Sequence, residues 1–106
     1  MNYYTSSTIA GKKITRTFGL VRGNTVRARN IGRDILAVLK NLIGGEIEDY
    51  TKLLAESRQQ AIDRMIEETK ALGGNAIVDA RFATSMVTGM AAEIIAYGTA
   101  VFVEDE

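Results

Sequence analysis

The sequence contains no cysteine and no histidine. Without cysteine, the chain forms no disulfide and has no thiolate that could act as a nucleophile or bind a metal. Without histidine, it lacks the side chain that most often serves as a general base or a metal ligand. Any catalysis would therefore depend on Asp, Glu, Lys, Tyr, Ser or Thr. Any metal site would depend on oxygen ligands or on methionine thioethers.

Long apolar runs are also missing. No stretch approaches the length of a membrane span, and the first residues, MNYYTSSTIAGKK, lack the basic start and apolar stretch of a signal peptide. We therefore expect a cytoplasmic protein that does not contact a membrane. The 106 residues, 46% of them hydrophobic, indicate one domain over 1–106 with its own core. A domain this small leaves much surface exposed as a monomer, so oligomerisation would stabilise it.

The charge is divided unevenly although the net charge is zero. Residues 1–45 hold eight basic residues against one acid, and residues 46–106 hold twelve acids against five basic residues. Such asymmetry can indicate a nucleic-acid surface. However, the basic residues are spread over a strand and a loop and lack clustered aromatics for base stacking. We therefore favour oppositely charged faces that meet within the fold or between subunits, and keep nucleic-acid binding as a weaker alternative.

Three stretches have the residue pattern of strands. The first, 13–29, mixes β-branched and apolar residues, and Gly19 and Gly23 within it indicate bulges or close backbone contacts. Its alternation places three side chains toward the core: Ile14, Phe18 and Leu20. The second strand is 75–87, where Val78, Ala80 and Phe82 alternate with Asp79, Arg81 and Ala83. The third, 91–103, is the most continuously apolar, so we place it in the middle of the sheet.

Two helices are predicted between the first and second strands. Asn30 is a suitable N-cap for a short amphipathic helix over 31–43, which Gly44-Gly45 ends. A longer helix runs from about Glu48 to Leu72, with acidic residues at its start, where the helix dipole favours negative charge.

The element order predicts an α+β, two-layer sandwich. Its three-stranded antiparallel sheet has the third strand central, and the long helix covers one face. The other face carries Ile95, Val101 and Val103, and no sequence is left over to cover it. This uncovered face is a second indication of an oligomer.

The motif Gly73-Gly74-Asn75 could be a phosphate cradle or a helix stop. Phosphate-binding glycine loops lead from a strand into a helix N-terminus, whereas these glycines follow a helix C-terminus, whose partial charge is negative. A left-handed C-cap is the favoured interpretation. We interpret Gly44-Gly45 as a linker, because Glu46, Glu48 and Asp49 occupy the electropositive helix end that follows. No nucleophile–base pair is visible, so we expect no enzyme activity and no cofactor.

A series of short motifs covers nearly the whole chain. In order they are GLVRG at 19–23, ARNIGRD at 28–34, GGEIEDY at 44–50, LLAESRQQAIDRM at 53–65, ALGGNAIVDARF at 71–82 and YGTAVFV at 97–103. Together they resemble the YbjQ-like family, a group of small bacterial and archaeal proteins labelled as heavy-metal-binding. The resemblance implies a dodecin-like subunit with an antiparallel sheet, assembled into a ring, a pentamer.

The positions that match the family pattern fall into two groups. Turn, cap and packing positions are Gly19, Gly23, Gly44, Gly45, Gly73 and Asn75. Polar positions that would line a shared pocket or a subunit contact are Asn30, Asp34, Tyr50 and Arg58. No set of metal-ligand residues is predicted, because cysteine and histidine are absent.

Several functions remain open at this point. The favoured one is a non-catalytic, ring-forming protein that binds a small ligand or ion, or acts as a scaffold for a partner. Metal binding through oxygen ligands, as the family label suggests, is an alternative, and weak nucleic-acid binding by the basic N-terminal half is a further one.

Overall fold

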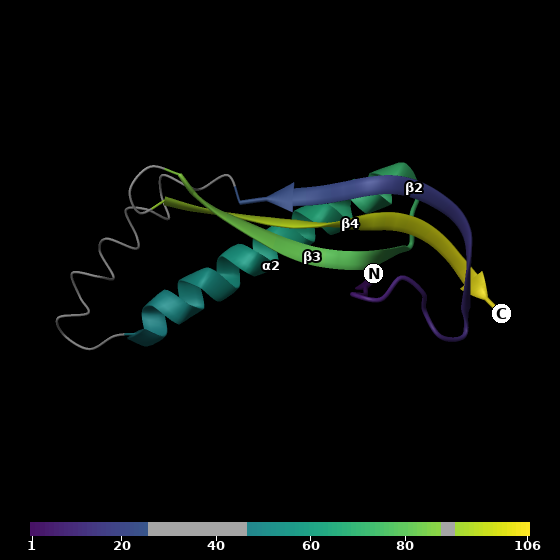
Figure 1. Cartoon of the computed structure of the whole chain (residues 1–106), viewed down its shortest axis with the longest axis horizontal. Helices are drawn as coiled ribbons and strands as arrows, with labels where there is room; N and C mark the ends of the chain where they lie inside the picture. Colours follow the sequence, from purple (N-terminus) through teal and green to yellow (C-terminus); the bar gives the residue numbers. More distant parts are fainter. Residues whose placement is uncertain (26–46, 88–90) are drawn as a thin grey trace.

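The computed structural model describes residues 1–25, 47–87 and 91–106, and the side chains of 1–25, 54–85 and 93–106. One long helix, α2, packs across one face of a β-sheet (Figure 1). The element bounds are β1 Asn2–Tyr3, β2 Lys12–Asn24, α2 Ile47–Leu72, β3 Ala76–Val87 and β4 Ala91–Asp105. The predicted long helix is confirmed. The predicted helix over 31–43, with its Asn30 cap and the Gly44-Gly45 linker, lies outside the described residues.

The sheet has the strand order β1-β3-β4-β2. β4 lies between β3 and β2 and pairs with both in antiparallel fashion, which confirms the central position predicted for the third strand. The prediction of a three-stranded, wholly antiparallel sheet is wrong. β1 adds a fourth strand parallel to β3, with Asn2 opposite Ala76 and Tyr3 opposite Ile77. Two residues are too few to show a strand pattern in the sequence. The dodecin-like ring stays a prediction.

The main core lies between α2 and the sheet face that it covers, called the helix face below. Its buried members are Val21, Ala61, Ile62, Met65, Ile77, Ala80, Ile94, Ala96 and Ala100. Many of the sheet residues are small, which lets the helix backbone come close. At Gly23 a Cβ atom would lie 2.1 Å from the Ala61 carbonyl oxygen and 2.6 Å from the Met65 nitrogen. The close backbone contact predicted at Gly23 is therefore confirmed.

The opposite, outer face of the sheet is partly covered by the N-terminal segment, residues 2–11. Tyr4 and Ile9 of this segment pack on a second buried cluster of Ala76, Val78 and Val101. Val101 is only 1% exposed. The prediction that no sequence is left to cover Val101 and Val103 is therefore wrong, because the polar-looking segment MNYYTSSTIAG supplies two apolar side chains. Tyr97 and Leu20 lie beyond its reach, at 36% and 66% exposure.

β-Bulges change which side chains face the core. β2 shifts register between Ile14 and Arg16 and again between Thr17 and Gly19, where Gly19 has φ +108°. As a result Phe18 packs on the helix-face core and Ile14 on the outer-face cluster, so the shared face predicted for them is wrong. Leu20, predicted to be buried, is exposed, and its neighbour Val21 is fully buried instead. The bulge predicted at Gly19 is confirmed.

A further bulge lies in β3, between Val78 and Arg81. Asp79 has a φ of +53°, a left-handed conformation that aspartate tolerates better than most residues. The bulge places Val78 in the outer-face cluster and Ala80 in the helix-face core, whereas the alternation predicted one face for both. The N-terminal segment is bonded to this bulge. The Asp79 and Ala80 N–H groups donate to the Ser6 and Tyr4 carbonyls at 3.0 and 2.9 Å.

No helix in the described parts of the chain is long and apolar enough to cross a membrane. The cytoplasmic location inferred from the sequence stays a prediction.

Candidate functional site: a polar pocket beside the N-terminal segment

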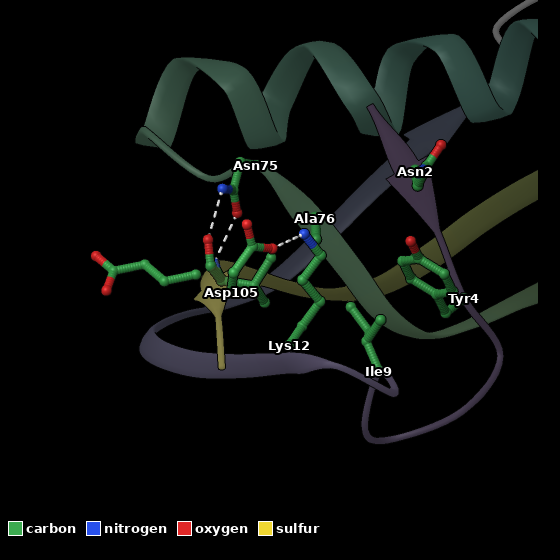
Figure 2. A pocket seen from close by; sticks show the side chains of 9 residues that line it. Asn2, Tyr4, Ile9, Lys12, Asn75, Ala76 and Asp105 are labelled. Atoms are coloured by element: carbon green, nitrogen blue, oxygen red, sulfur yellow. Dashed lines mark hydrogen bonds and ion pairs between the residues drawn. The ribbon is translucent and has the colours of Figure 1, made fainter.

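A pocket of about 420 Å³ opens where the N-terminal segment meets the start of β3 and the end of β4. The residues that line it are Asn2, Tyr4, Ile9, Lys12, Asn75, Ala76, Val103, Glu104 and Asp105. Figure 2 shows Asn75 and Asp105 on one side of this N-terminal pocket and Tyr4 on the other, with Lys12 between them. Its wall thus combines one cation, two carboxylates, two amides and a phenol.

Asn75 forms the fixed side of the pocket. Its side-chain amide donates from Nδ2 to the Val103 carbonyl at 2.9 Å, and its Oδ1 accepts from the Val103 N–H at 2.8 Å. Its backbone N–H donates to the Val101 carbonyl at 3.0 Å. The amide therefore extends the β3–β4 ladder by one step before the start of β3. One Nδ2 hydrogen and one Oδ1 lone pair remain beyond these two bonds.

The helix end places Asn75 in that position. Gly73 has φ +93°, and the Gly73 and Gly74 N–H groups donate to the Lys70 and Thr69 carbonyls, each at 3.0 Å. This pair of bonds is the Schellman arrangement, which closes a helix C-terminus and reverses the chain. The predicted C-cap at Gly73 is confirmed, and the carbonyl end of the helix faces the glycines.

Lys12 and Asp105 form an ion pair across the pocket, between the first residue of β2 and the last residue of β4. The hydrogen bond to Asp105, and then the charge of that carboxylate, raise the pKa of Lys12 above its ordinary value. The same hydrogen bond and the lysine charge lower the pKa of Asp105. Both groups are exposed, so the pair serves to position charges and contributes little to stability.

The floor of the pocket comes from the N-terminal segment. Tyr4 is held by its N–H, which donates to the Ile77 carbonyl at 2.8 Å, and by its carbonyl, which accepts from Ala80. Ile9 begins a tight turn that Lys12 ends, in which the Lys12 N–H donates to the Ile9 carbonyl at 3.1 Å, with Gly11 at φ +76°. The pocket therefore exists only when this segment is docked on the sheet.

The wall presents hydrogen-bond donors and acceptors of both charge signs. Lys12 keeps two N–H donors beyond its bond to Asp105, and each carboxylate keeps free lone pairs. A cation and acids on one wall suit a ligand that itself carries both charges. Among the described residues, no group of three or more carboxylates is close enough to hold a metal ion.

The residues predicted to line a shared pocket or contact are not brought together within the described structure. Asn30 and Asp34 lie outside the described residues. Tyr50 lies in the first turn of α2, and its side chain is outside the described set. Arg58 is exposed on α2 and does not line the N-terminal pocket. Among the described positions that were predicted to be structural, Asn75 also lines this pocket.

Sequence reasoning missed Lys12, Asp105 and the N-terminal segment. Lys12 and Asp105 are 93 residues apart. They meet because β2 and β4 are antiparallel, so that the first residue of β2 lies opposite the last residue of β4. A signal existed for this pair, since antiparallel neighbours bring the start of one strand to the end of the other. For Tyr4 and Ile9 the only signal was two apolar side chains within a polar stretch.

Comparison with known proteins agrees with the motif series. A family described as "Putative heavy-metal-binding" matches residues 1–104. A UPF0145 protein of Halorubrum lacusprofundi is 55% identical over 101 residues, which cover 95% of this chain and 97% of the relative. One from Methanosarcina acetivorans is 52% identical over 97 residues, covering 92% of each chain. One from Pyrococcus furiosus is 55% identical over 102 residues, covering 96% and 90%.

A solved structure of a protein of unknown function from Pediococcus pentosaceus is 15% identical, with a TM-score of 0.44, and the match covers 98% of this chain and 96% of that one. This likeness is too distant to bear on the fold. The names of these three relatives do not refer to a reaction. The family match over almost the full chain and the identities above 50% confirm the resemblance: the chain belongs to the YbjQ-like family, whose curated relatives are named UPF0145 proteins.

Proposed function

We propose that the chain is a non-catalytic binding protein that takes a small zwitterion in the N-terminal pocket and acts as a homo-oligomer. The observation that carries the binding proposal is the composition of the pocket wall, with Lys12 opposite Asp105 and the fixed amide of Asn75 beside them. The carboxylate of a zwitterion would meet Lys12, and its ammonium would meet Asp105 or Glu104. Free amino acids are the simplest ligands with this charge pattern.

The test is an NMR titration of the ¹⁵N-labelled chain with glycine, L-glutamine and L-glutamate. We expect shift changes that saturate and that are largest at Asn75, Ala76 and Lys12. Lys12→Met should abolish saturation. Lys13→Met is the matched control, because it removes the same charge from the next residue, which does not line the pocket. Shift changes scattered over the surface, or an equal loss in both variants, would contradict the proposal.

Self-assembly is supported by the open sides of the sheet. The outer edge of β2 has no neighbouring strand in the described structure, and β3 beyond Ala80 pairs only with β4. Phe82 is 50% exposed on the β3 side, beside an apolar pocket of about 220 Å³ whose walls include Ile62 and Met65. Unpaired edges with exposed apolar side chains favour pairing with further copies. We propose that the copies close into a ring of five, as the family resemblance implies.

Sedimentation velocity of the native chain and of Phe82→Lys tests this assembly. The native chain should sediment as a multiple of its 11.5 kDa mass, and the variant as smaller species. Lys13→Glu, a charge change of similar kind at another exposed position, should leave the mass unchanged. A native chain that is monomeric at micromolar concentration would rule out the ring.

Metal binding through oxygen ligands is the second candidate, which the family description favours. The described residues contain no three-carboxylate cluster, so such a site would draw on acids outside the described set or on acids from more than one copy. Calorimetry with Zn²⁺ and Mn²⁺ on the assembled protein should give saturable heat if this is correct. Heat no larger than that of buffer would exclude it.

A further inference from the structure

Beyond the N-terminal segment, the outer face of the sheet presents a row of three side chains. Arg22 of β2 is opposite Tyr97 of β4, and Tyr97 is opposite Arg81 of β3. The residue before each of them in its strand shows which face of the sheet they occupy. Val21, Ala96 and Ala80 belong to the helix-face core, so the next residue of each strand points to the outer face. Tyr97 is 36% exposed and both arginines are exposed.

The row carries positive charge that nearby acids do not neutralise. Among the described residues, neither arginine is in an ion pair. Glu93 lies on the same face further along β4, but its carboxylate accepts hydrogen bonds from Asn24 at 2.9 Å and Ser85 at 3.4 Å. Glu68 reaches the edge of β2 from α2 and accepts from the Arg22 backbone N–H at 3.4 Å. Within the described parts of the chain, neither guanidinium is therefore neutralised by an ion pair.

Arg81 is also fixed in place. Its Nη1 donates to the Thr5 carbonyl at 2.8 Å and to the Ala80 carbonyl at 2.9 Å. A guanidinium has five N–H donors, so donors remain for a phosphate while these two bonds hold the group against the N-terminal segment at the edge of β3, where Arg81 also lines the pocket next to Phe82. Adjacent strands are about 4.8 Å apart, which places the two arginine backbones about 10 Å apart with the ring between them.

We propose that this row, Arg22–Tyr97–Arg81, is a stacking platform for single-stranded nucleic acid. A base stacks on the exposed face of Tyr97, and phosphates on either side meet the two guanidinium groups. β2 adds no acid to this face, and Lys12 lies further along the strand with its charge paired to Asp105. Arg16 stacks on Phe18 of the helix-face core and is not part of the row. In the sequence, Tyr97 is far from the basic residues of the N-terminal half. The strand register supplies Tyr97, which is 75 residues away from Arg22.

A second copy of the chain is a poorer occupant of this face. In the ring proposed above, the contacts between copies are heterologous and are assigned to the strand edges beside Phe82, which leaves this face free. A two-fold contact would instead place the patch against itself and bring the arginine rows together. A free nucleotide would gain only one stack and one or two phosphate contacts on a flat surface. A strand can place successive phosphates at Arg22 and Arg81 while one of its bases stacks on Tyr97, so the polymer is favoured.

The experiment measures fluorescence anisotropy of a labelled oligo-uridine of about 12 nucleotides, a length within the usual site size, with the full native chain. Binding should weaken steeply between about 50 mM and about 200 mM salt. Tyr97→Thr should weaken binding about 5- to 150-fold, the range expected for loss of one stack, whereas Tyr97→Phe should bind as the native chain does. Arg22→Gln should lower the slope of log K against log salt by about 0.7 for each phosphate that this side chain neutralises in the native complex.

Lys70→Gln on α2 is the matched control, because it removes one positive charge away from the outer face. Circular dichroism of every variant verifies that it is folded. The proposal is overturned by a native chain that shows no binding at low salt. It is equally overturned by a Tyr97→Thr variant that binds normally, by Lys70→Gln weakening binding as much as Arg22→Gln, or by uridine monophosphate competing as strongly as the oligomer. A fall in sedimenting mass in Tyr97→Thr would assign the face to contact between copies instead.

Discussion

At the scale of single residues, glycines determine how closely the layers pack and where the strands bend. Gly23 lets β2 lie against the backbone of α2, whereas Gly19 supplies a positive φ at a bulge with open space around it. The two positions therefore exclude a side chain for different reasons. At Gly23 the reason is steric, and at Gly19 it is conformational.

These two reasons predict different costs for alanine. Gly23→Ala should lower the free energy of unfolding by at least about 1–3 kcal/mol, because its Cβ would overlap the Ala61 carbonyl and force α2 away from the sheet. Gly19→Ala should cost about 1–2 kcal/mol, the strain of a left-handed non-glycine residue. Urea unfolding of both variants measures the difference. A smaller loss for Gly23→Ala than for Gly19→Ala would contradict the close approach.

The Lys12–Asp105 pair predicts a titration. Because the pKa of Asp105 is lowered, its small contribution to stability is present above the unfolded-state pKa of about 3.9 and is lost as the pH falls through the folded pKa. Because the pKa of Lys12 is raised, its contribution is present below about pH 10.4 and is lost as the pH rises through its folded pKa.

Carbon-detected NMR of the Asp105 carboxyl should therefore give a midpoint below the ordinary aspartate value. In Lys12→Met the midpoint should rise toward that value, and in Lys13→Met it should not. If the titration midpoint of Asp105 is the same in the native chain and in both variants, the ion pair is absent in solution.

At the scale of elements, the short N-terminal segment contributes to three separate features of the fold. Two strand residues and a loop cover the outer-face cluster, shape the N-terminal pocket and complete the bulge at Asp79. Ser7 adds a side-chain bond from its Oγ to the Asp79 carboxylate at 2.8 Å. The bulge and the segment are therefore expected to open and close together.

Hydrogen exchange tests this coupling. Ile9→Ala removes apolar contact from the cluster, so the Asp79 and Ala80 amides, which donate to the segment, should exchange faster. The Gly73 and Gly74 amides of the helix cap should keep their protection and serve as the internal control. Uniform acceleration at all four amides would show that the segment does not open as a separate unit.

The elements differ in how far they could be predicted from the sequence. α2 was predicted to within a residue, because a 3.6-residue pattern repeats over many turns and a glycine pair ends it. The central place of β4 followed from its continuous apolar run. β1 was not predicted because a strand of two residues is too short to show an alternating pattern. The face predicted for Leu20 was wrong because the bulges in β2 are set by its pairing with β4. For the N-terminal pocket, antiparallel pairing could have brought Lys12 and Asp105 together, but the contribution of Tyr4 and Ile9 depends on the pairing of β1 with β3, which the sequence does not show.

At the scale of the whole molecule, the described parts behave as one body. β4 touches β2 and β3 along their lengths, α2 packs on both β2 and β4, and the N-terminal segment is bonded to β3. Both buried clusters contain residues of β3 and β4. Unfolding of these strands would therefore disrupt the core on both faces of the sheet.

We therefore expect a single cooperative unfolding transition for the domain. Far-ultraviolet circular dichroism and the fluorescence of its four tyrosines should change at the same urea concentration. The comparison must be made at one protein concentration, since self-assembly would shift the midpoint. Two separated transitions would indicate that the segment or the helix folds as an independent unit.

The parallel pairing of β1 with β3 also sets an order of events during synthesis. Asn2 and Tyr3 leave the ribosome early, but their partners, Ala76 and Ile77, are made 74 residues later. At ordinary elongation rates this delay is roughly 4–15 seconds. Throughout that time Tyr4 and Ile9 have no cluster to cover. The polar serines and threonines between them are thus suited to keep a waiting segment in solution until the sheet that it closes has been made.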